Sequence, residues 1–141
     1  MRQSMETVVS VSPKDPKNSA RRKDVHPSCL GVSSLYRLEG SLSKSQIDKI
    51  ARELLCDPVV ESFRLNDIPT SPGQVFVDVW YKPGVMDPAG ASVLKAVRDL
   101  GIPSLARASC GARYVFDREV PDSVSRELLN PLIQERKVRR A

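Results

Sequence analysis

The residues best suited to chemistry lie between positions 82 and 90, where Lys82, Gly84 and Gly90 surround the start of a predicted helix. Free backbone amides at a helix N-terminus attract anions, so a turn of this composition could bind phosphate. The spacings of a P-loop and of a dinucleotide-binding loop are both absent, and Asp87 is placed to cap the same amides. We therefore interpret this turn, shaped by Pro83 and Gly84, as a structural element that presents a partner-binding surface.

The other reactive side chains are too scattered to form a catalytic or metal site. The cysteines are Cys29, Cys56 and Cys110, without a C-x-x-C pair, and His26 is the single histidine. This set fits reduced thiols of a cytoplasmic protein and lacks the ligand spacing of a zinc site. Cys110 has no base beside it in the sequence that would activate it as a nucleophile. The sequence therefore predicts no catalytic residue and no metal site.

Acidic and aromatic side chains in the predicted strands favour structural roles. Asp78 and Asp117 could form a carboxylate pair, but single acids on strands usually mark a solvated face. Trp80 lies between Val79 and Tyr81 in an apolar stretch. We expect Trp80 to pack in the core or between two halves of the chain, with a partner-binding role as the alternative.

The charge of the chain is concentrated at its two ends. The 141 residues are 40% hydrophobic and 28% charged, which is typical of globular proteins, and the net charge is +5. The basic clusters are residues 21–23 and 136–140, and no aromatic residues interleave with them to stack on bases. We expect solvated ends, with a small basic nucleic-acid-binding domain as the alternative function. No apolar stretch is long enough to span a membrane, which favours a cytoplasmic protein.

The first part of the chain shows one clear strand–helix–strand run after an undefined start. Residues 1–30 form either an N-terminal arm or a degenerate first strand and helix. Alternation predicts a strand over 34–39. The Ser43–Gln46 spacing predicts a capping box for a helix that ends before Pro58. A strand over 59–65 and a linker over 68–73 follow.

The second part shows a longer alternation of strands and helices. Asp87 and Pro88 predict the start of a helix that Gly101 ends in a left-handed conformation. The other predicted elements are strands over 75–81, 112–116 and 132–138 and a short helix over 123–129.

An internal repeat connects the two parts. The sequence from Arg52, RELLCDPVVE, recurs from Arg126 as RELLNPLIQE with one residue deleted, and each copy follows a strand that contains a tyrosine. We expect an α+β fold of two tandem strand-helix-strand-helix-strand units, with helices on one face of antiparallel sheets. The two units are expected to pack as a pseudo-two-fold sandwich. The boundaries are 1–30 for the N-terminal segment, 31–68 for the second half of copy one and 74–138 for the complete copy two.

The second copy resembles the PurS family, the small subunit of phosphoribosylformylglycinamidine synthase. The resemblance rests on the turn K-P-G-V-x-D-x-x-G at residues 82–90, the Leu-Gly pair at 100–101 and the G-x-x-Y strand from Gly111. Residues 35–60 resemble the back half of another such unit, of the kind found in tandem forms. Copy one lacks the K-P-G-V motif and has only residues 13–16, Pro-Lys-Asp-Pro, at this place.

The resemblance implies a non-catalytic subunit that bridges a glutaminase subunit and a large ATP-dependent synthetase subunit. Such a bridge supports ammonia transfer in de novo purine biosynthesis, and self-association is also expected. No cofactor is implied for this chain. The partner-binding candidates are Lys82, Pro83, Gly84, Asp87, Gly90 and Arg113.

Overall fold

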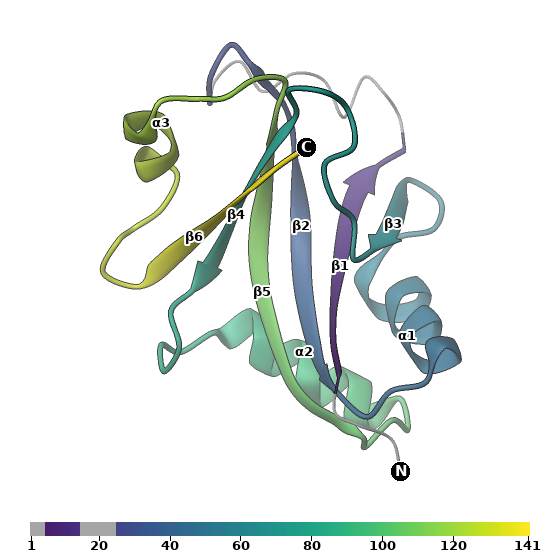
Figure 1. The fold of residues 1–141 in the computed structure, drawn as a ribbon. Coiled ribbons are helices and arrows are strands. Elements are labelled where there is room, and N and C mark those ends of the chain that lie inside the picture. The colour runs from purple at the N-terminus through teal and green to yellow at the C-terminus, as the bar shows by residue number, and fades with distance from the viewer. Residues whose placement is uncertain (1–4, 15–24) are drawn as a thin grey trace.

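One six-stranded antiparallel sheet organises the described residues, 5–14 and 25–141, of this computed structural model (Figure 1). The strands lie in the order β3-β1-β2-β5-β4-β6. Along the chain the elements are β1 (Met5–Pro13), β2 (Cys29–Gly40), α1 (Lys44–Ile50), the π-helix η1 (Ala51–Leu55), β3 (Glu61–Leu65), β4 (Val75–Tyr81), α2 (Pro88–Asp99), β5 (Leu105–Phe116), α3 (Asp122–Glu127) and β6 (Gln134–Arg140). The predicted α+β class and antiparallel pairing are confirmed.

The two longest strands, β2 and β5, join the N-terminal strands to the C-terminal strands. They pair from Cys29 opposite Phe116 to Gly40 opposite Leu105, so β3-β1-β2 and β5-β4-β6 form one continuous sheet. The predicted sandwich of stacked sheets is therefore wrong. Side-by-side pairing satisfies the backbone N–H and C=O groups along both long strands, which stacking would leave as open edges.

Local sequence signals set the helix ends as predicted. The Ser43 hydroxyl accepts a hydrogen bond from the Gln46 amide, and the Gln46 side chain accepts one from the Ser43 amide, which completes the capping box of α1. The Asp87 carboxylate accepts a hydrogen bond from the Gly90 amide at the start of α2. Gly101 follows the end of α2 with a φ of 95°, the left-handed conformation that glycine adopts without strain.

The helix before Pro58 continues from α1 into η1, where the backbone takes up a π-turn. A π-turn holds one residue more than an α-turn. Cys56 is the residue that the corresponding sequence after Leu129 lacks, since Leu129 is followed directly by Asn130. The π-turn therefore lies where the longer of the two related segments has to accommodate an additional residue.

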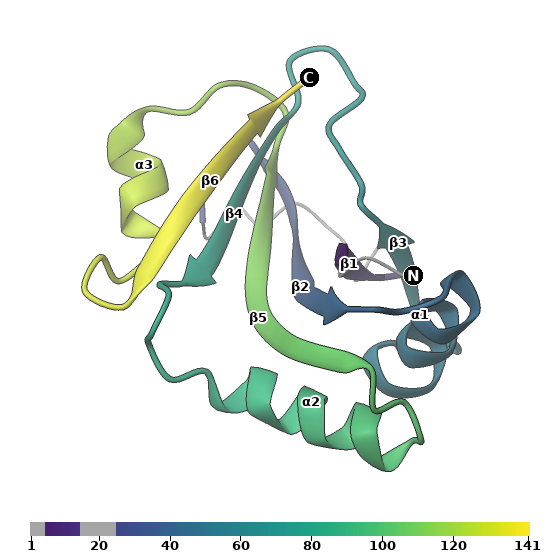
Figure 2. The same ribbon diagram turned by 60° about the horizontal axis from the view of Figure 1, so that its bottom comes forward.

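All three α-helices cover the same face of the sheet (Figure 2). Val32 and Leu38 of β2 point to this face, because they are an even number of residues apart and the pairing between them is regular. Leu38 packs in a core cluster with α1, η1 and α2, whereas Val32 packs in a second cluster beside α3. Among the described residues, no helix covers the opposite face of the sheet. Side chains on that face are covered only where a loop or a neighbouring side chain lies over them.

The N-terminal segment contributes an interior strand. The sequence left residues 1–30 open as an arm or a degenerate strand and helix, and β1 pairs with both β2 and β3. Val9 and Val11 of β1 are buried in the core beside α1. The basic cluster at residues 21–23 lies outside the described residues. The helices that the structure describes include none long and apolar enough to cross a membrane.

Candidate partner-binding site

The turn at residues 82–90 begins with a lysine that contacts a neighbouring loop. The Lys82 amide donates a 2.8 Å hydrogen bond to the Ile133 carbonyl, and the Lys82 ammonium donates one to the Pro131 carbonyl. Gly84 has a φ of 83°, a conformation that favours glycine, while Pro83 and Gly84 are both exposed. Lys82 thus joins the turn to residues 130–134, which connect α3 to β6.

Asp87 and Gly90 fix the other end of the turn against β5. One Asp87 carboxylate oxygen accepts from the Gly90 amide at 2.9 Å, and the other accepts from the Cys110 amide at 2.8 Å. A Cβ added at Gly90 would lie 2.5 Å from the Ala108 carbonyl oxygen, so only glycine allows α2 this close to the strand. Asp87 occupies the helix N-terminus with its own charge, which leaves the site unsuited to an external anion.

Asp87 also affects the neighbouring thiol. Burial and the nearby Asp87 carboxylate together raise the pKa of Cys110 to about 11. A thiol with this pKa is protonated at neutral pH and is a poor nucleophile. The raised pKa therefore agrees with the prediction that Cys110 is not activated as a nucleophile. Among the described residues, no group of three His, Cys, Asp or Glu side chains gathers at a place that could hold a metal ion.

A second lysine makes the same contacts in the N-terminal half of the sheet. The Lys14 amide donates a 2.8 Å hydrogen bond to the Val60 carbonyl, and its ammonium donates to the Pro58 carbonyl. Lys14 follows β1 as Lys82 follows β4, and residues 57–61 lead into the first residue of β3 as residues 130–134 lead into the first residue of β6. We call residues 57–61 the first tip and residues 130–134 the second tip.

The two tips share their internal hydrogen bonds as well. In the first tip the Asp57 amide donates to the Glu61 carboxylate at 2.9 Å, and the Asp57 carboxylate accepts from the Val59 amide at 3.0 Å. In the second tip the Asn130 amide donates to the Gln134 side chain at 2.8 Å, and the Asn130 side chain accepts from the Leu132 amide at 3.1 Å. The same local structure is therefore built from acids in one tip and from amides in the other.

Arg113 lies away from the turn, on the sheet face that has no helix. Its guanidinium forms a two-point ion pair with Asp78, with hydrogen bonds of 2.8 and 3.0 Å, and both side chains are only 3% exposed. The Arg113 guanidinium also stacks over Phe76 at 4.5 Å. The sequence placed Asp78 on a solvated face; it is buried because Arg113, on the neighbouring strand, neutralises it there.

Trp80 packs across the seam between the two halves of the sheet. It lies directly opposite Gly111, and a Cβ on Gly111 would come within 2.8 Å of the indole ring. The Arg37 guanidinium of β2 lies 4.1 Å from the centre of the Trp80 ring. The predicted packing of Trp80 between the halves is confirmed. The indole ring packs against Gly111 of β5 and against the Arg37 guanidinium of β2.

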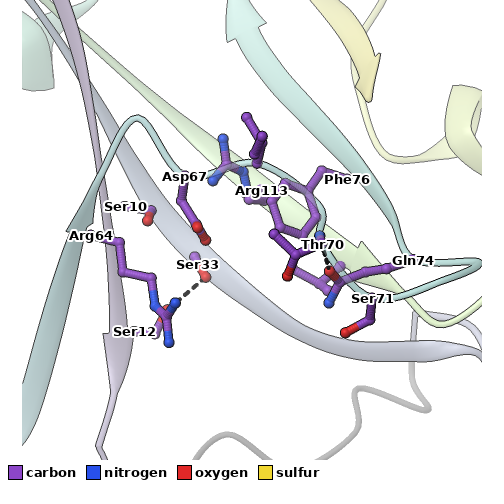
Figure 3. A pocket seen from close by; sticks show the side chains of 12 residues that line it. Ser10, Ser12, Ser33, Arg64, Asp67, Thr70, Ser71, Gln74, Phe76 and Arg113 are labelled. Atoms are coloured by element: carbon purple, nitrogen blue, oxygen red, sulfur yellow. Dashed lines mark hydrogen bonds between the residues drawn. The ribbon is translucent and has the colours of Figure 1, made fainter. Parts of the chain in front are cut away.

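A polar pocket of about 320 Å³ opens on the same face, beside the loop from β3 to β4 (Figure 3). Serines of β1 and β2 line it, and Ser12 and Ser33 hydrogen-bond to each other at 2.7 Å. Arg64, Asp67 and the buried Arg113 complete much of its wall. Of the predicted site residues only Arg113 reaches this pocket, so the structure does not bring the six candidates together at one place.

The basic C-terminal strand is partly neutralised by acids next to it. Arg136 forms an ion pair with Asp122, and Arg140 forms one with Glu119. The hydrogen bond from Arg140 lowers the pKa of Glu119 and keeps that carboxylate charged. The two arginines therefore have acidic partners and do not form a free surface for phosphates.

Comparison with known protein families gives one match that covers the turn, both of its supporting strands and the second tip. The PurS family model, described as phosphoribosylformylglycinamidine (FGAM) synthase, matches residues 74–140. Over these residues the chain is similar to the PurS family. A search among curated proteins found no match to the chain. The match confirms the resemblance to PurS that residues 82–90 and 111–114 indicated.

The matched segment contains the elements from β4 to β6, with the candidates Lys82 to Gly90 between β4 and the start of α2 and Arg113 in β5. The tips were not among the predicted site residues. Their signal was present in the sequence, because the repeated segments both contain an acid or amide followed by proline and two aliphatic residues. What the sequence did not reveal is that a distant lysine holds each of these tips.

Proposed function

We propose that this chain is a non-catalytic structural subunit of an FGAM synthase complex, which bridges the glutaminase and synthetase subunits in the cytoplasm and supports ammonia transfer between them. The observation that carries the proposal is the PurS match over residues 74–140. The role belongs to de novo purine biosynthesis, and the chain itself supplies no catalytic residue and no cofactor.

The electrostatics of the chain support a non-catalytic role. The most buried charged side chains, Asp78 and Arg113, neutralise each other, and Asp87 is engaged by two backbone amides. A pKa of about 11 keeps the Cys110 thiol protonated. Catalytic groups usually need a pKa near the working pH and a free path to the substrate. The Cys110 thiol lacks such a pKa, and the three charged side chains are held by the partners named above.

We further propose that residues before Gln74 form a second, abbreviated PurS-like unit. The strand order reads outward from the β2–β5 seam as β2-β1-β3 on one side and β5-β4-β6 on the other. Tyr36 lies opposite Val9, and Tyr114 lies opposite Val77, at equivalent places relative to Lys14 and Lys82. The matched contacts of the two lysines and the two tips support the same arrangement.

Co-expression with the glutaminase and synthetase subunits of the same cell tests the bridging function. We expect the three chains to elute together from a sizing column when glutamine and nucleotide are present. Glutamine-dependent synthesis should fall when this chain is omitted, while synthesis from added ammonia should continue. Separate elution of all three chains, together with unchanged glutamine-dependent activity, would contradict the proposal.

A further inference from the structure

The two tips expose aliphatic side chains at opposite corners of the sheet. Val59 in the first tip is 80% exposed, and Leu132 in the second tip is 82% exposed. Val60 and Ile133 follow them and are also exposed. Figure 1 shows the second tip beside the start of β6 and the first tip beside β3, on the far side of the sheet. Each tip therefore presents a pair of adjacent exposed aliphatic side chains, and the two pairs occupy matched places at the starts of β3 and β6.

Each tip is fixed before any partner binds. In the first tip the amides of Val60 and Glu61 donate to the Asp57 carbonyl, and in the second the amides of Ile133 and Gln134 donate to the Asn130 carbonyl. Together with the side-chain bonds and the lysine contacts, this holds the backbone of both tips in one conformation. A contact made by a preorganised loop loses little conformational entropy, which favours its use in binding.

The charges of the two tips differ although their hydrogen bonds agree. Asp57 and Glu61 use carboxylate oxygens where Asn130 and Gln134 use amide oxygens. Because the amides make equivalent bonds, the local structure does not require the two negative charges of the first tip. Lys14 with Asp57 and Glu61 has a net charge of −1, whereas Lys82 with the two amides has +1. The charge difference between the tips can therefore determine which partner each tip binds.

We propose that the two tips bind different subunits of the complex, the first through an aliphatic pocket with a basic rim and the second through an aliphatic pocket whose rim is not basic. The proposal rests on the bridging function and assigns its two contact points. Val59 and Val60 enter the first pocket, while Asp57 and Glu61 face its basic rim. Leu132 and Ile133 enter the second pocket. Complementary rim charges decide which subunit meets which tip, because a like-charged rim would repel the wrong one.

Single substitutions at the exposed aliphatic positions test the assignment. Binding of Val59→Asp and Leu132→Asp variants to the purified glutaminase subunit and to the purified synthetase subunit is measured separately. We expect each variant to lose about tenfold or more in affinity for one subunit and to retain the other, since an anchor residue in a pocket commonly contributes this much. Ile68→Asp, at a 56% exposed position outside both tips, is the matched control and should bind as the parent chain does.

An amide exchange tests the charge separately from the aliphatic contact. The double variant Asp57→Asn and Glu61→Gln gives the first tip the side chains of the second, so the fold and the thermal midpoint should stay unchanged. Its affinity for the subunit lost by Val59→Asp should fall, and the salt dependence of that binding should weaken. Unchanged affinity and salt dependence would overturn the role assigned to Asp57 and Glu61.

The outcomes separate this inference from the proposed function. If the parent chain binds neither subunit, the bridging function fails. If the parent chain binds both and the two aspartate variants also bind both with parental affinity, the bridging function stands and the tips are not its contact points. If both variants lose the same subunit, the tips share one partner and the assignment of separate subunits is overturned.

Discussion

At the scale of single residues, the ion pair of Asp78 and Arg113 is the most unusual feature of the sheet. Strand positions at this depth normally carry apolar side chains, and removing two charges from water costs several kcal/mol for each ion. The two-point geometry and the stacking of Arg113 on Phe76 offset this cost. Each partner is therefore stabilising only while the other is present.

Replacing Asp78 by Ala should destabilise the chain strongly, because Arg113 then keeps a buried charge without its counter-charge. We expect a loss of about 3–5 kcal/mol in the free energy of unfolding, measured by urea denaturation. The double variant Asp78→Leu with Arg113→Met should recover most of this loss, since it removes both charges. A loss below about 1 kcal/mol in the single variant would mean that water reaches Arg113 and that the pair is not effectively buried.

The raised pKa of the Cys110 thiol predicts how the stability of the fold changes at alkaline pH. Its pKa in the folded chain is about 11 against an ordinary value of 9.0, chiefly because of burial and then because of Asp87. A raised thiol pKa means that the fold favours the protonated form, so this contribution is complete below pH 9 and is lost as the pH rises towards 11. Thermal midpoints across this range should fall less steeply for Cys110→Ala than for the parent chain. Equal slopes would contradict the assignment.

At the scale of helices and strands, the features that could be predicted from the sequence are those set by residues close to one another in the chain. The Ser43 capping box, the Asp87 cap and the Gly101 helix end each involve residues within one turn, and all three are confirmed. The strand at 75–81 was likewise predictable, because its apolar positions need no knowledge of the partner strands.

Features that depend on distant partners were not predictable. The burial of Asp78 requires Arg113, which is 35 residues away, and the lysine contacts of the tips span 44 and 49 residues. The sandwich was a reasonable way to cover two amphipathic sheets, but the sequence does not say whether β2 meets β5 edge to edge. The π-turn also escaped prediction, although the extra Cys56 marked its place.

Deletion of Cys56 tests whether the π-turn is there to accommodate this additional residue. Removing this residue should convert η1 to α-helical geometry and leave the first tip in place, because the second copy reaches its tip without such a residue. We expect a folded chain with unchanged helical circular dichroism and a modest loss of stability from the missing buried side chain. Deletion of Ala96 in α2 is the control, and it should be far more damaging because α2 contains no π-turn to absorb it. Similar damage from both deletions would refute this role of the π-turn.

At the scale of the whole molecule, the β2–β5 seam makes the two halves one folding unit. It is the central pairing of the sheet, and Trp80 and Arg37 contact each other across it. The outer strands β3 and β6 are poorly suited to further pairing, since β3 is only 5 residues long and β6 carries four basic residues. The two longest of the described strands, β2 and β5, thus cover each other's edges.

Residues 74–141 alone should therefore associate with themselves. Without β2, the 12-residue strand β5 has an open edge whose N–H and C=O groups lack partners, and a second copy of β5 is an equally long strand that can pair with it. Light scattering on a sizing column should give a dimer for the fragment, with much tighter association than the full chain shows under the same conditions. Adding a fragment of residues 1–73 should compete with this dimer, because β2 restores the original pairing. A fragment that stays monomeric and folded would show that β5 needs no partner strand, and the seam would then not be what unites the two halves.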